Sequence, residues 1–156
     1  MRRFGIIALA ATVFAVLVGP DGPLGRFWAP DPDAPAAHGA VLAGLIGENM
    51  VENIAFGVGI AILLLGRRWF AARTDTARAG QIARIATAWL LASWMPHAAL
   101  HRHLGMQPTG ILPVEWIFHA GSILAAVLLL WAFAHTVAAP ARRSRPADNS
   151  TVRQPR

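Results

Sequence analysis

Three pairs of ionisable side chains share one spacing in this sequence of 156 residues. In each pair the two residues lie four positions apart, and residues four apart project from one face of an α-helix. Each pair therefore offers, on one helical face, two groups that can bind a metal ion or carry protons. The pairs are Glu48 with Glu52, His97 with His101, and Glu115 with His119.

Carboxylate and imidazole groups together are the ligands that zinc and iron accept in proteins. Helical bundles build such sites from Glu and His side chains that project inward from facing helices. We therefore predict a zinc or iron site, of which at most four or five ligands are used at once. The candidate ligands are all six residues: Glu48, Glu52, His97, His101, Glu115 and His119.

No single motif within this set is diagnostic. The HExxH pattern of zinc proteases is absent, because Ala98 follows His97. Glu115 and His119 form ExxxH, whereas soluble di-iron proteins use ExxH. The metal interpretation therefore rests on the whole constellation, and the sequence does not decide between a catalytic and a structural ion.

Three other classes of function stay open from the sequence. A b-type haem could use two of His97, His101 and His119 as axial ligands, although it leaves the glutamates of residues 48–52 without a role. The same groups could form a metal-free acid–base or proton-coupled relay. Alternatively, the chain could be a non-catalytic membrane assembly subunit, in which polar groups only specify helix packing.

The composition indicates whether water or lipid surrounds the helices that position these groups. Charged residues make up 14% of the chain, whereas soluble domains carry about 25%. Hydrophobic residues make up 55%, and the mean hydropathy is +0.46. The chain has no cysteine, which excludes disulfides, thiolate zinc sites, CxxCH haem attachment and a cysteine nucleophile. We therefore expect the lipid bilayer as its main partner.

Four apolar segments approach the roughly 20 residues that a helix needs to cross a bilayer. Residues 1–139 are thus predicted to form an all-α integral membrane protein, a four-transmembrane-helix bundle. Pro96 should kink the third helix and aim His97 inward. The first segment also has the pattern of a signal peptide but lacks a small-x-small cleavage site directly after it, so we expect it to be retained. The segments span about residues 4–18, 40–65, 82–100 and 112–137.

The arginines set the orientation. Of the 14, 12 lie near the N-terminus, in residues 67–84 or in residues 142–156. The positive-inside rule then places both termini in the cytoplasm, in a multi-pass protein of the cell inner or plasma membrane. These clusters flank apolar runs, so we predict no nucleic-acid partner. Residues 140–156 should form a disordered basic tail. A homo-oligomer or a membrane partner subunit is possible.

This topology places the three pairs at a similar depth. With a rise of about 1.5 Å per residue, Glu48, Glu52, Glu115 and His119 lie roughly 5 to 10 Å below the outer boundary. His97 lies about as deep, and His101 lies at the boundary itself. All three pairs are therefore expected in one slab beneath the outer surface.

Overall fold

The structure is a computed structural model that describes residues 1–28, 37–104 and 108–143, with only the backbone described for residues 108–109 and 135–143. Every regular element in these ranges is helical, which confirms the predicted all-α class. The elements are α1 (Arg2–Val18), the 3-10 turn η1 (Gly25–Trp28), α2 (Gly39–Leu65), α3 (Arg67–Ala71), α4 (Ala77–Ala92), α5 (Trp94–Leu104) and α6 (Pro108–Arg143).

The third predicted segment is divided into two helices at Ser93. Pro96 has no backbone N–H, and its ring would clash with the carbonyl of Ala92, four residues earlier. Accordingly, α4 ends at Ala92 and α5 begins two residues later. Hydrogen bonds from Ser93 N–H to the Trp89 carbonyl and from His97 N–H to the Ser93 carbonyl bridge the break. The bend expected near Pro96 therefore lies just before it.

The fourth segment forms a longer helix than expected. Pro108 occupies its first position, where a missing N–H costs nothing, and the helix continues through Arg143. It therefore includes the first residues of the predicted disordered tail. The rest of that tail, residues 144–156, lies outside the described part of the chain.

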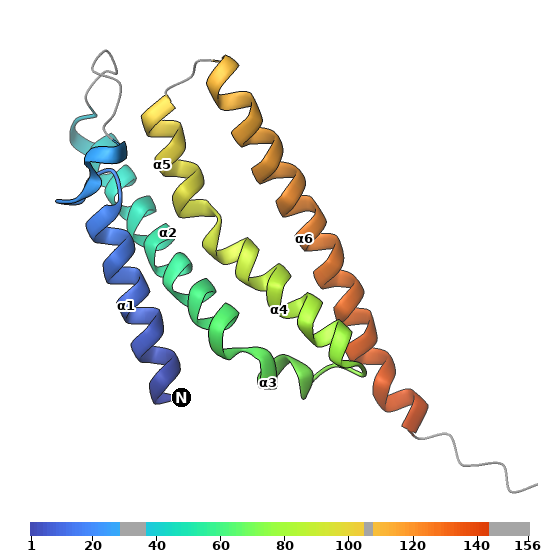
Figure 1. Ribbon diagram of the computed structural model, residues 1–156. Helices are drawn as coiled ribbons and strands as arrows, with labels where there is room; N and C mark the ends of the chain where they lie inside the picture. Colours follow the sequence, from blue (N-terminus) through green and yellow to red (C-terminus); the bar gives the residue numbers. More distant parts are fainter. Residues whose placement is uncertain (29–36, 105–107, 144–156) are drawn as a thin grey trace, which may run out of the picture.

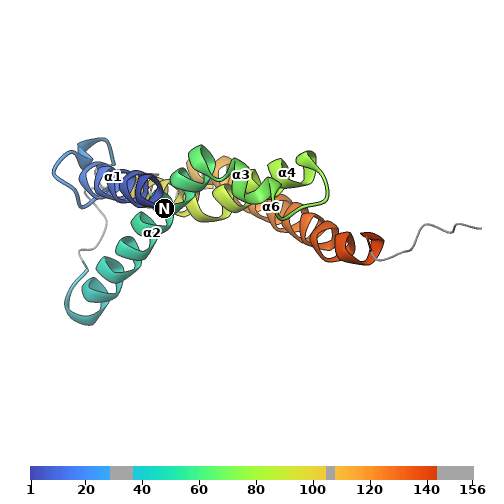
Figure 2. The same ribbon diagram turned by 90° about the horizontal axis from the view of Figure 1, so that it is seen from below.

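The helices lie side by side in an open row (Figure 1). α1 packs on α2, α2 packs on α4 and α5, and these two pack on α6. Seen from below in Figure 2, α1 lies at one end and α6 toward the other, and the first half of α2 projects sideways out of the row. A closed bundle would also bring α1 against α6, and extensive packing of that kind is absent among the described residues. The described part of the chain is therefore all-helical, and the four-transmembrane-helix bundle stays a prediction.

Small residues form the contacts between neighbouring helices. Any side chain at Gly57 would overlap Thr12 and Ala8 of α1, and one at Gly59 would press on Ala88 and Ala92 of α4. Most buried apolar residues are alanines, and no large side chain is fully buried among the described residues. Close backbone approach through small residues is the packing mode of helices in lipid.

The large apolar side chains lie on the outside. Exposed residues of α6 include Trp116, Ile117, Leu130 and Phe133. Soluble monomers rarely expose apolar surface on this scale. Two helical stretches, Gly39–Leu65 and Gly110–Ala134, are long and apolar enough to cross a membrane.

Candidate metal centre

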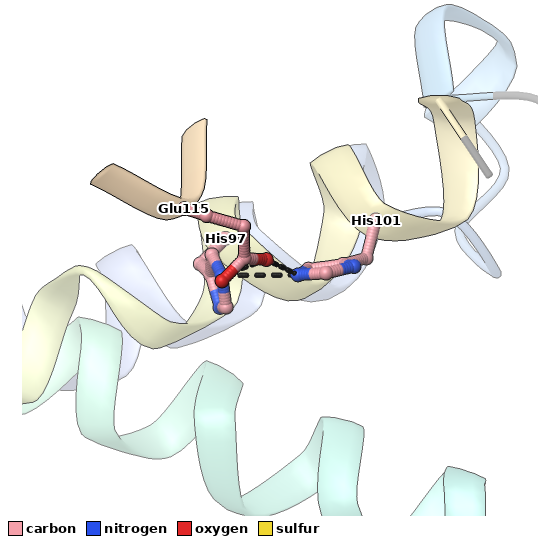
Figure 3. Close-up of side chains that lie close together, drawn as sticks. All are labelled: His97, His101 and Glu115. Atoms are coloured by element: carbon pink, nitrogen blue, oxygen red, sulfur yellow. Dashed lines mark hydrogen bonds and ion pairs between the residues drawn. The ribbon is translucent and has the colours of Figure 1, made fainter. Parts of the chain in front are cut away.

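Two helices, α5 and α6, bring a histidine pair and a glutamate together. α5 carries His97 and His101 on one face, and the facing helix α6 carries Glu115 (Figure 3). The break at Ser93 allows α5 to depart from the line of α4 while it still packs on α6. The site is thus built from α5, which begins after the break, and from the continuous helix α6.

The donor atoms of this group converge. His97 Nε2 lies 3.1 Å from His101 Nε2 and 3.4 Å from Glu115 Oε1. His101 Nε2 forms an ion pair with the same Glu115 oxygen. The three ligand atoms all lie within 4.8 Å of one another. We call His97, His101 and Glu115 the His-His-Glu group.

The two separations from His97 are compatible with one bound ion. Zinc lies about 2.0 to 2.1 Å from imidazole nitrogen and carboxylate oxygen, so two ligands at tetrahedral angles are about 3.3 Å apart. The separations of 3.1 and 3.4 Å from His97 lie on either side of that value. Two histidines and one carboxylate form the ligand set of several catalytic zinc sites and of non-haem iron oxygenases.

His119 contacts the other oxygen of the shared carboxylate. Its Nδ1 lies 2.9 Å from Glu115 Oε2 and 2.9 Å from the Glu115 backbone carbonyl. The ion pair with Oε2 holds the carboxylate in the rotation that presents Oε1 to His97 and His101. His119 is therefore placed to orient a ligand, the role that outer partners play at metal sites.

Phe118 holds the His97 ring. The two rings are stacked with their centroids 3.7 Å apart and an angle of 6° between their planes. The His97 side chain is 13% exposed, whereas that of His101 is 32% exposed. His97 is thus the more enclosed of the two histidines, and stacking restricts the direction in which its Nε2 points.

An apolar groove of about 390 Å³ runs between α2, α4, α5 and α6 and reaches His97. Ser93 is one of the few polar residues along it, and its buried Oγ has no hydrogen-bond partner within the described part of the chain. An apolar molecule in this groove would contact the enclosed side of the His-His-Glu group. Lining residues include Gly59, Leu63, Trp89, Ser93, His97 and Phe118.

The other two predicted ligands lie apart from this group. Glu48 is exposed on α2. Glu52 lines a separate cavity of about 120 Å³, together with Asn53 and Met95. Among the described residues, the group that can hold a metal ion does not include either glutamate. The physical reason is that α5 packs on both α2 and α6 and stands between them (Figure 1), so the glutamates of α2 do not reach the carboxylate of α6.

A polar junction stands beside that second cavity. Asp21, in the loop after α1, accepts hydrogen bonds from Asn49 of α2 at 2.5 Å and from Arg102 of α5 at 2.6 Å. It ties the loop after α1 to α2 and α5. Sequence reasoning did not identify Asp21 or Arg102, because no local pattern connects residues this far apart. Phe118 was also missed, although it lies three residues after Glu115, on the same part of the helix surface.

No family model matches this chain, and no match was found among curated proteins or solved structures.

Proposed function

We propose that the protein is an integral membrane protein that binds one zinc or iron ion through His97, His101 and Glu115. The observation that carries this proposal is the convergence of three ligand atoms from two helices within 4.8 Å. His119 would support the site through the second Glu115 oxygen. Three protein ligands leave one position of a tetrahedral ion for water or substrate, which is typical of catalytic and metal-handling sites.

The arrangement of the helix ends supports four membrane passes. The N-terminus, the connection between α3 and α4, and the end of α6 all lie at the lower end in Figure 1. The arginines of residues 2–3, 67–84 and 142–143 therefore belong to that end, which the positive-inside rule assigns to the cytoplasm. The protein would span the cell inner or plasma membrane with both termini inside, and the His-His-Glu group would lie in the outer half.

The geometry favours a single ion over a b-type haem. His97 and His101 come from successive turns of one helix, and their Nε2 atoms are 3.1 Å apart. Axial ligands of a haem must approach opposite faces of the porphyrin. The His97 ring is also stacked on Phe118, which occupies one of its faces.

A proton relay is the second candidate, and one observation favours it. Glu115 connects His97 and His101 on one side with His119 on the other, so hydrogen bonds and ion pairs run through all four groups. Such a chain can move protons without a metal. Proton transfer would then persist after complete removal of metal, whereas metal-dependent chemistry would cease.

The outer turns of α2 support an oligomer or a partner subunit. Residues 39–48 are exposed apart from Leu45, and side chains added at Gly44 or Gly47 would meet nothing within 4 Å. Glu48 lies on this uncovered stretch, where contact with lipid would be costly. A second protein surface over this stretch would shield the carboxylate.

The test is metal analysis of the purified protein. Wild type, His97→Ala and the control Glu48→Gln would be purified in detergent, treated with chelator, reloaded with Zn²⁺ or Fe²⁺, and measured by elemental analysis. We expect about one ion per chain in wild type and in Glu48→Gln, and none in His97→Ala. Substoichiometric metal in wild type, or equal metal in all three proteins, would overturn the proposal. Co²⁺ loading adds a visible spectrum that reports the coordination geometry.

A further inference from the structure

A pocket lined by charged residues lies beside α3, the short helix at the lower end of the molecule in Figure 1. It has a volume of about 510 Å³ and lies between the short helix α3 and the first half of α4. We call it the arginine pocket. Its lining residues are Arg67, Ala71, Ala77, Arg78, Gln81 and Arg84.

Close packing holds the two walls of this pocket in place. A side chain at Gly80 would press on Thr74 and on the backbone of Ala71, so α3 and α4 approach closely at that glycine. Thr74 Oγ1 also bonds the carbonyls of Phe70 and Thr76, which fixes the connection between the helices. The pocket is therefore a formed concavity and does not depend on a loosely held loop.

The charged side chains that line the pocket are all positive. Three of its six lining residues are arginines, and no carboxylate lines it in the described part of the chain. The first turn of α4, at Ala77 and Arg78, adds the positive end of a helix dipole. An anion in the pocket would therefore meet guanidinium groups and backbone donors together.

Arg84 is the least exposed of the three arginines that line the pocket. Its Nη1 donates to the carbonyl of Leu63 at the end of α2, while its buried Nε has no hydrogen-bond partner within the described part of the chain. A buried guanidinium N–H without an acceptor is costly. By contrast, Arg73, outside the pocket, already stacks on the Trp69 ring at 3.9 Å and donates to the Trp69 carbonyl.

We propose that the arginine pocket binds a phosphate group, in the chemistry of an anionic phospholipid headgroup. Guanidinium groups match phosphate oxygens in geometry and charge. The pocket lies at the arginine-rich end of the chain, where a membrane-spanning arrangement places the cytoplasmic headgroups, and basic pockets between helices bind such headgroups. This proposal rests on the membrane-spanning part of the proposed function but uses none of the residues of the metal centre, so it can hold even if the metal site fails.

Native mass spectrometry of the full chain in neutral detergent tests the proposal. Phosphatidylglycerol and phosphatidylcholine would be added separately to wild type, to the pocket variant Arg67→Gln/Arg78→Gln, and to the control variant Arg68→Gln/Arg73→Gln. The two variants lose the same net charge, but the control leaves the pocket lining intact. Arg84 is left unchanged because it also bonds the end of α2.

We expect wild type and the control variant to retain one phosphatidylglycerol more strongly than phosphatidylcholine. The pocket variant should bind phosphatidylglycerol about 25-fold more weakly, at about fivefold for each arginine. Inorganic phosphate forms the second arm: if it displaces the lipid from wild type at low millimolar concentration, a free phosphate is the source of the ligand. Equal loss in both variants, with unchanged helix content by circular dichroism, would show general charge attraction and overturn the site.

Discussion

Glu48–Glu52 on α2 and Glu115–His119 on α6 share a spacing of four residues and an expected depth, yet different side chains surround the two pairs. Glu115 forms ion pairs with His97 and His101 of α5 and with His119 of its own helix. Glu48 is exposed, and Glu52 lines a cavity of its own. Equal spacing and equal depth therefore do not lead to equal surroundings.

The difference comes from the helix that each pair faces. Spacing and depth are properties of one helix, but a polar neighbour depends on how that helix is rotated and on what packs against it. α5 presents His97 and His101 toward α6, and it turns Met95, Ala99 and Arg102 toward the loop after α1 and the cavity beside α2. One face of α5 thus contributes to the His-His-Glu group, and the opposite face contributes to the cavity beside α2.

The largest expected effect is on Zn²⁺ affinity, which should differ between variants of Glu115 and Glu52. Glu115→Gln removes a charged ligand from the His-His-Glu group, so Zn²⁺ affinity should fall by about 100-fold or more, beyond the 10- to 100-fold typical of outer partners. The matched change Glu52→Gln should leave affinity within about twofold, since Glu52 lies outside the group. Competition with a chromogenic chelator measures both. An equal loss in the two variants would make α2 part of the metal site.

His119→Ala should have the next largest effect. It removes the ion pair that orients the Glu115 carboxylate, and loss of such a partner costs about 10- to 100-fold in metal affinity. His119→Asn, which keeps a donor, should recover part of that loss. The same chelator titration applies. If His119→Ala abolished binding as completely as His97→Ala, His119 would be a ligand and not an orienting group.

Acidification should weaken metal binding by a smaller factor. A metal ion binds neutral imidazole, so protons compete for His97 and His101, and affinity falls as pH falls. Two coordinating imidazoles should make this decrease steeper than a single one would. Glu52→Gln should show the same pH profile as wild type. A flat profile would contradict coordination by both histidines.

The smallest effect should come from the polar junction beside α2. Asp21→Asn weakens an exposed ion pair with Arg102, and such pairs contribute about 0 to 1 kcal/mol. We expect a small decrease in thermal stability and metal affinity within about twofold of wild type. Thermal unfolding in detergent, followed by circular dichroism, checks the first expectation. A large loss of metal affinity would show that the α2 side controls the position of His101.

Much of the helical layout was predictable because its causes are local. Apolar runs of sufficient length predict helices, and Pro96 predicted the interruption that separates α4 from α5. The four-residue spacing of His97 with His101 likewise guarantees a shared face on any helix. The stacking of Phe118 on His97 was not predictable, because it depends on the rotation of α6 relative to α5.

The amino-acid sequence by itself determined the helical class, the apolar exterior and the three helix faces that carry histidine or carboxylate groups, since these follow from periodicity and composition along one chain. Only the tertiary structure decided that α5 meets α6 through His97, His101 and Glu115 while Glu48 and Glu52 remain apart. Small residues let each helix approach its neighbours in a row, and the order of that row selects which polar faces meet.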